Sequence, residues 1–346
     1  MAVAKKIRVL IVDDSPLLRE ILARGISTDP QIEVVARAKD AYEARDKIIE
    51  FNPDVMTCDI QMPKMNGIEF IKRLIPQYSL PVIVVSSISE AVFDALNAGA
   101  VDFVAKPTVN SLSCREAFIE DITHKIKVAF RANISKGKKL PVSKDTNLLI
   151  PEVLNKKIIA IGASTGGTEA IFSVLKGLPA RVPGIVIVQH IPPGFSTMFA
   201  ERLDKQLELS VKEAQEGDYV EPGRVLLAPG NKHMTLRKLG SRYKVECKSG
   251  EKVNGHCPSV DMLFYSVAKW AGKDAIGIIL TGMGKDGAKG LLAMRQNGAR
   301  TLGQDEKSSV VYGMPKIAYE IAAVERQVSL ASIPSALMQI LKEKTE

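Results

Sequence analysis

Residues 158–167 read Ile158-Ile159-Ala160-Ile161-Gly162-Ala163-Ser164-Thr165-Gly166-Gly167. Their first part is a β-branched run of strand length, and the glycines that follow permit a sharp turn into a helix-like segment. A buried strand that turns directly into a helix is typical of an α/β fold. The same turn presents the Ser164 hydroxyl, as a nucleophile elbow does.

The spacing in this turn leaves three interpretations open. A helix that starts after Ser164 directs backbone N–H groups at the turn, where they suit either a developing oxyanion or a phosphate. The pattern Gly162-x-Ser164-x-x-Gly167 differs from a dinucleotide-binding loop only in its serine at the second glycine position. Alternatively, Ser164 or Thr165 simply caps the helix.

Length and composition indicate an ordinary globular protein. The chain has 346 residues, of which 46% are hydrophobic and 25% charged, so we expect two or more domains with separate cores. The apolar runs are far shorter than the roughly 20 residues that cross a bilayer, and the first residues do not resemble a signal peptide. We therefore expect a cytoplasmic protein without direct membrane insertion.

Cysteine spacing and the placement of aromatic residues argue against two further classes. The four cysteines form no C-x-x-C pair, which favours reduced thiols over a zinc site or a disulfide framework. The net charge of +8 resides mainly in the second half of the chain. However, the single Trp, seven Tyr and ten Phe do not interleave with basic residues as in a nucleic-acid-binding surface. Nucleic acid is therefore not an expected partner.

The N-terminal part alternates β-branched runs with amphipathic segments. Five strands are predicted, at Ile7–Val12, Ile32–Ala38, Val55–Cys58, Val82–Val85 and Val101–Ala105. Five such units predict a doubly wound, flavodoxin-like parallel sheet. We assign residues 1–127 to this domain. Residues 128–155 are polar and basic and are interpreted as the end of a helix followed by an exposed linker.

A second α/β pattern covers residues 156–346. Buried strands are predicted at Ile158–Ile161, Ile185–Gln189, Arg224–Ala228 and Ile276–Leu280, and Ser332–Lys342 is predicted to be a closing helix. Ser241–Cys247 alternates like a hairpin strand, which predicts a mixed sheet. The expected fold is therefore α/β with two doubly wound domains. The C-terminal one is mostly parallel and Rossmann-like, with some antiparallel strand content.

Charged side chains follow several predicted strands of the first domain. Asp13 and Asp14 follow the first strand, Asp59 the third, Ser86 the fourth and Lys106 the fifth. Because the carboxyl ends of such strands meet in one crevice, these groups should converge. The carboxylates would repel one another unless a cation such as Mg²⁺ lay between them. The pattern predicts a site that binds Mg²⁺ and accepts a phosphoryl group; helix caps and ion pairs are the alternative for the aspartates.

This constellation resembles the receiver domain of bacterial two-component response regulators over roughly residues 5–127. The resemblance implies that Asp59 is the phospho-acceptor. It also implies that Asp13, Asp14, Asp59 and the backbone carbonyl of Gln61 bind Mg²⁺.

The resemblance extends to the switch residues of the family. Ser86 is similar to the family's switch hydroxyl, with Ser87 as a competing assignment. Phe103 is similar to the switch aromatic residue, and Lys106 to the family's lysine.

A serine nucleophile in the second domain would need a histidine base and a carboxylate. His190 ends a buried strand, as Ser164 nearly does, whereas His124 is expected to be solvated in the other domain. His233 and His256 are interpreted either as bordering a cleft or as structural loop residues. Asp286 follows the strand at 276–280, so Ser164, His190 and Asp286 should share one sheet edge.

The loop that contains Asp286 also permits a different function. Gly282-x-Gly284-x-x-Gly287 is a complete dinucleotide fingerprint between a strand and a helix, and Asp305 follows at a suitable distance. A receiver-regulated NAD-binding oxidoreductase is therefore one alternative. A receiver linked to a DNA-binding output is a second alternative, since the second half of the chain is basic.

Nearly the whole chain resembles the chemotaxis response-regulator protein-glutamate methylesterases, the CheB family. The matching segments are 162–167, 189–192, 199–203, 228–234, 258–261, 281–287, 304–306 and 312–315. By this resemblance Ser164 is the nucleophile, His190 the general base and acid, and Asp286 the orienting carboxylate. Thr165 and Met283 are implied to line the site and its oxyanion hole. Asn231 departs from the family, where an aspartate is common.

The resemblance implies a phosphorylation-regulated serine hydrolase. Its substrates would be γ-glutamyl methyl esters on the cytoplasmic domains of methylated chemoreceptors, with deamidation of receptor glutamines as a second activity. A chemotaxis histidine kinase would donate the phosphoryl group, and the receiver would inhibit the hydrolase until phosphorylated. Mg²⁺ is the expected cofactor of the receiver, and the hydrolase domain is expected to need none.

Overall fold

A computed structural model describes residues 5–87, 89–107, 112–133 and 156–343. The chain divides into two compact units, Met1–Gly137 and Lys138–Glu346. Residues 134–155, which include most of the predicted linker, lie outside the described residues. Among the described residues, no helix is both long and apolar enough to cross a bilayer.

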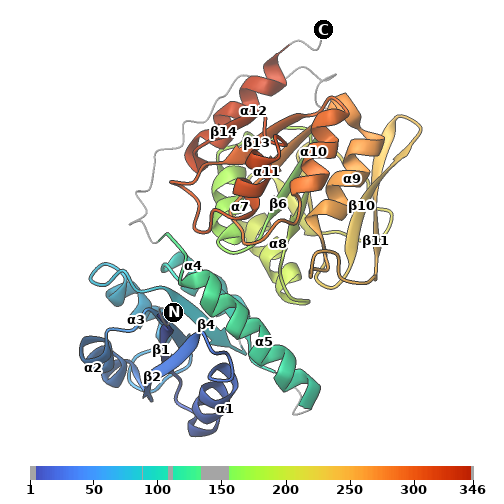
Figure 1. Cartoon of the computed structure of the whole chain (residues 1–346). Coiled ribbons are helices and arrows are strands. Elements are labelled where there is room, and N and C mark those ends of the chain that lie inside the picture. Colours follow the sequence, from blue (N-terminus) through green and yellow to red (C-terminus); the bar gives the residue numbers. More distant parts are fainter. Residues whose placement is uncertain (1–4, 88, 108–111, 134–155, 344–346) are drawn as a thin grey trace. The chain divides into compact units, whose positions relative to one another are not determined.

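The first unit is a five-stranded parallel sheet with alternating helices, as predicted (Figure 1). The elements in chain order are β1 (Ile7–Val12), α1 (Pro16–Ile26), β2 (Ile32–Ala38), α2 (Ala41–Phe51), β3 (Val55–Asp59), α3 (Gly67–Leu74), β4 (Val82–Ser86), α4 (Ser89–Asn97), β5 (Asp102–Ala105) and α5 (Leu112–Ala129). The strand order is β2-β1-β3-β4-β5. This order brings the carboxyl ends of β1 and β3 side by side, because the two strands pair directly.

The second unit contains a seven-stranded sheet in which all pairs are parallel. Its strands, in spatial order, are β14 (Arg326–Val328), β13 (Arg300–Gln304), β12 (Ala275–Ile279), β6 (Ile158–Ala163), β7 (Gly184–Gln189), β9 (Arg224–Leu227) and β8 (Ser210–Glu213). Every residue of β6, β7 and β12 is buried. This burial matches the continuous apolar runs from which those three strands were predicted.

Antiparallel pairing occurs outside this sheet. Strands β10 (His233–Leu239) and β11 (Arg242–Lys248) form a separate two-stranded hairpin. The antiparallel content is therefore present as predicted, but the prediction of a mixed main sheet was wrong. The alternation arises because Tyr243 and Val245, on one face of β11, are buried, whereas the other face is exposed or half-buried.

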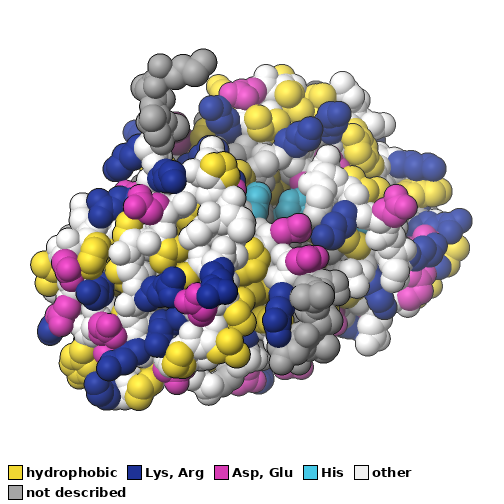
Figure 2. Space-filling model, turned by 60° about the horizontal axis from the view of Figure 1, so that its bottom comes forward, with side chains coloured by type: hydrophobic (Ala, Val, Ile, Leu, Met, Phe, Trp, Pro, Cys, Tyr) yellow, Lys and Arg dark blue, Asp and Glu magenta, His cyan; other side chains and the backbone are white. Residues whose placement is uncertain are grey.

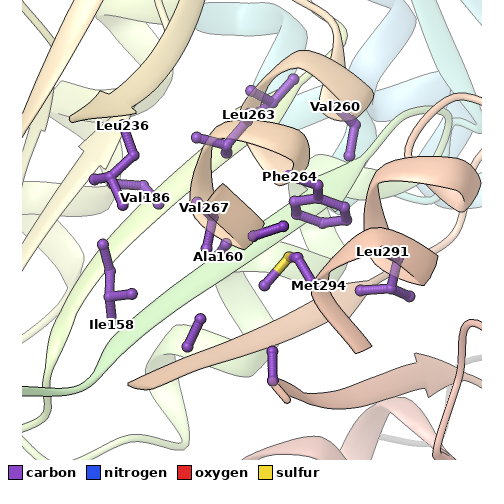
Figure 3. Packing of buried hydrophobic residues seen from close by; sticks show 14 of the residues in the cluster. Ile158, Ala160, Val186, Leu236, Val260, Leu263, Phe264, Val267, Leu291 and Met294 are labelled. Atoms are coloured by element: carbon purple, nitrogen blue, oxygen red, sulfur yellow. The ribbon is translucent and has the colours of Figure 1, made fainter. Parts of the chain in front are cut away.

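The helices of this unit are α7 (Gly167–Lys176), α8 (Phe195–Gln206), α9 (Val260–Trp270), α10 (Ala288–Gln296), α11 (Met314–Glu320) and α12 (Ile333–Lys342). The predicted closing helix is α12. Helices α9 and α10 pack on each other and on β6 and β12. Figure 3 shows Phe264 of α9 and Met294 of α10 gathered with Ala160 of β6 in this buried cluster.

Gly162 allows α9 to approach β6 closely. A Cβ at this position would lie 2.2 Å from Cγ1 of Val260, the first residue of α9. Valine is stiff at χ1, so the clash could not be relieved by a simple rotation. The glycine in the strand is thus required for the position of α9, whose N-terminus borders the candidate site described below.

We expect Gly162→Ala to lower the free energy of unfolding by about 1–3 kcal/mol, because it overpacks this contact. Urea unfolding can be followed with the single tryptophan, Trp270, which ends α9. In a Val260→Ala background the same substitution should cost less, since the clashing methyl group is absent. An equal loss in both backgrounds would contradict this explanation.

Candidate functional site

Ser164 lies on a tight turn between β6 and α7. Gly167 N–H donates to the carbonyl of Ser164 at 2.7 Å. Gly166 is the N-cap of α7, with φ of +75°, and no side chain caps this helix. The interpretation of Ser164 or Thr165 as a helix cap is therefore wrong. The positive φ explains the glycine, since other residues rarely adopt it.

His190 is held beside this turn by the adjacent strand. Strand β7 pairs with β6, and His190 N–H continues the pairing by donating to Ala163 O at 3.1 Å. The Gln189 amide donates to Ser164 O at 2.9 Å and to His190 O at 3.1 Å. Gln189 therefore ties the backbones of Ser164 and His190 together, a role that the sequence analysis did not assign.

Asp286 reaches the same sheet edge from the loop between β12 and α10. Its Oδ2 lies 2.9 Å from Nε2 of His190, and its side chain is only 1% exposed. Gly282 in the same loop lies against Ser164, since a Cβ on Gly282 would be 2.7 Å from Ser164 Cβ. The structure therefore brings together Ser164, His190 and Asp286, as the sequence predicted.

Four further groups donate hydrogen bonds to the Asp286 carboxylate. Oδ1 accepts from the Asn254 amide and the Ser259 hydroxyl, both at 2.8 Å. The backbone N–H groups of Val260 and Asp261, at the start of α9, donate at 2.7 and 3.3 Å. The carboxylate thus lies at the N-terminus of a helix, where its negative charge is favoured.

These contacts determine the ionisation of Asp286. Burial alone would raise the pKa of this carboxyl. The hydrogen bond and attraction of His190, together with the hydrogen bonds from Asn254 and Ser259, outweigh burial and hold the pKa well below its usual range. Asp286 is therefore ionised at neutral pH and can orient His190.

The contact with Asp286 selects which nitrogen of His190 is available for chemistry. If Nε2 carries the proton that is shared with Asp286, the lone pair of a neutral ring is on Nδ1. Among the described residues, neither His190 Nδ1 nor the Ser164 hydroxyl has a hydrogen-bond partner. Hydrogen bonds of this kind are often formed only when substrate is bound. Nδ1 is thus the ring nitrogen of His190 that remains available to accept a hydrogen bond.

The predicted receiver residues also converge. Ligand oxygens of Asp13, Asp14 and Asp59 all lie within 4.8 Å of one another. Lys106 Nζ lies 2.7 Å from Asp59 Oδ2 and 2.9 Å from Asp13 Oδ2. Three carboxylates at this spacing fit the oxygen ligands that Mg²⁺ takes. The exposed Gln61 follows Asp59 closely, with its N–H 3.3 Å from Asp59 Oδ1.

Burial and the charges of its neighbours determine the pKa of the Asp59 carboxyl. Burial, with the charge of Asp13, raises the pKa of Asp59, and the contact with Lys106 only partly offsets this. A divalent cation beside the group would favour its ionised form.

The switch candidates lie next to the same crevice. Ser86 is buried at the end of β4, and its carbonyl accepts from Lys106 N–H at 3.0 Å, whereas Ser87 is exposed. Phe103 is buried in β5 and packs edge-on against Phe93, with 6.5 Å between ring centroids. These positions are compatible with the switch roles predicted for Ser86, Phe103 and Lys106.

A family model described as CheB methylesterase matches residues 159–337. The chain belongs to the CheB methylesterase family. A second model, described as response regulator receiver domain, matches residues 9–114.

Curated relatives of this CheB-family chain match it over nearly its full length. A protein-glutamate methylesterase/protein-glutamine glutaminase 2 of Syntrophomonas wolfei is 56% identical over 343 residues, which are 98% of this chain and 99% of the relative. A protein-glutamate methylesterase/protein-glutamine glutaminase of Salmonella typhimurium is 48% identical over 338 residues, 96% of each chain. The catalytic domain of Thermotoga maritima CheB methylesterase is 37% identical with a TM-score of 0.52, over 53% of this chain and 98% of that domain.

The alternative of dinucleotide binding is not favoured in this CheB-family chain. The loop 282–287 has a fingerprint spacing, but its Asp286 carboxylate is directed at His190 and the start of α9. A carboxylate in this position would repel a pyrophosphate. A DNA-binding output is not favoured either, because the CheB methylesterase model covers residues 159–337, where that output would lie. On the face shown in Figure 2, Lys and Arg side chains are interspersed with Asp and Glu.

The other site candidates have different surroundings. Thr165 is buried, and its carbonyl accepts from the Thr281 hydroxyl at 3.0 Å. Met283 is half-buried in the loop that contacts Ser164. His233 is structural, with Nε2 2.8 Å from Glu251 O and Nδ1 accepting from Ser259 N–H. His256, in contrast, stacks on His190.

Three residues around Asp286 have no role that the sequence predicted. Ser259 and Asp261 lie in a segment that matched the family, but they had no assigned role. Asn254 lies outside every matched segment. The available signal was the Asn254-Gly255 pair, which is typical of a tight turn, although it does not indicate what the turn approaches.

The lowered pKa predicts a pH-dependent contribution of Asp286 to stability. The folded-state pKa of Asp286 lies below the ordinary value of 3.8. The ionised carboxylate therefore stabilises the folded protein fully at pH values above 3.8. The contribution is lost as pH falls through the folded-state pKa. Wild type should therefore resist urea better than Asp286→Asn at about pH 7, and the difference should narrow below about pH 4. A constant difference across this range would refute the prediction.

Proposed function

We propose that this protein hydrolyses γ-glutamyl methyl esters on the cytoplasmic domains of chemoreceptors, through an acyl-enzyme on Ser164. Deamidation of receptor glutamines by the same acyl chemistry is a second activity. The supporting observation is the His190–Asp286 hydrogen bond beside the Ser164 turn. The names of the full-length relatives support the substrate class.

In the proposed reaction His190 Nδ1 takes the hydroxyl proton of Ser164 while the serine oxygen attacks the ester carbonyl. The imidazolium ring is stabilised by ionised Asp286. His190 then returns the proton to the departing methoxide, and methanol leaves. Water, deprotonated by His190, attacks the acyl-enzyme carbonyl. His190 then returns this proton to the departing Ser164 oxygen, which gives the glutamate side chain and the free serine hydroxyl.

The oxyanion of each tetrahedral intermediate needs donors. Backbone N–H groups at the start of α7, and that of Met283 in the opposing loop, are the proposed donors. One such donor typically contributes about 2.7–4 kcal/mol to transition-state stabilisation. Thr165 and Met283 would line the entrance for the ester group.

Ser164→Ala should lower methanol release from methylated receptors at least about a thousandfold, because it removes the oxygen that forms the proposed acyl-enzyme. A fluorophosphonate probe should label wild type at Ser164 and leave the variant unlabelled. Ser210→Ala, on the exposed edge strand β8, is the matched control and should retain full activity. Normal turnover by Ser164→Ala would eliminate the proposed mechanism.

We further propose that phosphorylation of Asp59 by a chemotaxis histidine kinase regulates this hydrolase. Asp13, Asp14, Asp59 and the Gln61 carbonyl would hold Mg²⁺, which would neutralise charge on the incoming phosphoryl group. Lys106 and Ser86 lie where they could detect the new charge. In this proposal residues 1–127 form the receiver, 128–155 the linker and 156–346 the hydrolase of a cytoplasmic protein.

Acetyl phosphate with Mg²⁺ should raise the methanol-release rate of wild type several-fold and leave Asp59→Asn unchanged. The physical reason is that only a phosphorylated receiver shifts the inhibited population toward an active one. Without phosphodonor the two proteins should have equal rates. Stimulation of Asp59→Asn to the wild-type level would exclude Asp59 as the acceptor.

A further inference from the structure

The ring of His256 lies face to face with the ring of His190. Their centroids are 3.7 Å apart and their planes differ by 11°. Figure 2 shows histidine side chains reaching the surface of the molecule. The roles proposed above for Ser164, His190 and Asp286 do not include His256.

A stacked ring supplies a restraint that His190 otherwise lacks. The His190 side chain has one hydrogen bond, from Nε2 to Asp286. A single hydrogen bond fixes the position of one ring atom but allows the ring to rotate about the bond axis. Rotation would change the direction in which Nδ1 points. A parallel ring in van der Waals contact blocks this rotation, because a tilted His190 would collide with it.

A tight turn places His256 at this position. Val253 and His256 exchange two backbone hydrogen bonds of 3.0 Å around Asn254 and Gly255. Both central residues have positive φ, 53° and 86°, as a two-residue hairpin turn of this type requires. The geometry of the turn thus fixes the direction in which the His256 side chain leaves the backbone.

The same turn also contacts Asp286, the hydrogen-bond partner of His190. The Asn254 amide bridges the two carboxylates of Asp286 and Asp261, at 2.8 Å to each. One short segment therefore holds Asp286 through Asn254 and His190 through His256. These two contacts indicate that the turn positions the His190 and Asp286 side chains in addition to closing the loop.

We propose that His256 is a positioning residue that fixes the ring plane of His190 and so directs Nδ1 at the Ser164 hydroxyl. The proposal rests on the function proposed above. It requires a flat ring at position 256 and does not require proton transfer by that ring.

The experiment compares His256→Ala and His256→Asn, which lack the ring or replace it with a smaller amide, with His256→Phe, which keeps a flat ring. Loss of orientation should lower kcat of the first two variants by about 10- to 100-fold, as small misplacements of a catalytic group do. KM should change less than about twofold, since substrate contacts are unaltered. His256→Phe should recover most of kcat. His124→Ala, on the exposed part of α5, is the matched control and should match wild type.

Two measurements test the positioning role of His256 separately from misfolding of the variants and from failure of the proposed mechanism. Histidine proton NMR of the full chain should show an upfield ring-current shift of the His190 signals that is lost in His256→Asn. Ser164→Ala and His190→Ala are assayed alongside: if they retain activity, the proposed mechanism fails irrespective of His256. If they are inactive while His256→Ala keeps wild-type kcat, or while His256→Phe is as impaired as His256→Ala, the positioning role is overturned. Absence of the shift in wild type would also overturn it.

Discussion

The buried carboxylate of Asp286 is the group on which the geometry of the site depends. An ionised group with 1% exposure is tolerated only when its oxygens are hydrogen-bonded. Asp286 meets this requirement with donors from three parts of the chain: His190 after β7, Asn254 in the hairpin turn, and the start of α9. Each donor is held in place by the same charge that it neutralises. The position of α9 and the orientation of His190 are therefore parts of one electrostatic arrangement.

The parallel sheet supplies the framework for this arrangement. β6 pairs with β7 on one side and with β12 on the other. Ser164 follows the carboxyl end of β6, His190 that of β7 and Asp286 that of β12. Neighbouring parallel strands are about 4.8 Å apart, which is close enough for side chains at their ends to meet. The chain order of serine, histidine and aspartate thus follows from strand order. It differs from the orders in α/β-hydrolases, chymotrypsin and subtilisin, although the chemistry proposed here is comparable.

The elements that could be predicted from the sequence are those that a local residue pattern determines. Strands β6, β7 and β12 were predictable because they are continuous apolar runs, and Ser164 and Asp286 because glycines mark their turns. Strands β13 and β14 were missed, since Arg300–Gln304 and Arg326–Val328 are short and partly polar. The stack of His256 on His190 could not be predicted, because these residues are far apart in sequence and meet only through the Asn254–Gly255 turn.

The hydrogen bonds of Gln189 have a wider consequence. Its amide joins the backbone after β6 to the backbone after β7, and both strands lie in the buried centre of the sheet. Parts that are fastened to a packed core resist small displacements. Moving Ser164 away from His190 would therefore require disturbing this packed core. In the regulation proposed above, the receiver would therefore control the access of substrate and leave the arrangement of Ser164, His190 and Asp286 unchanged.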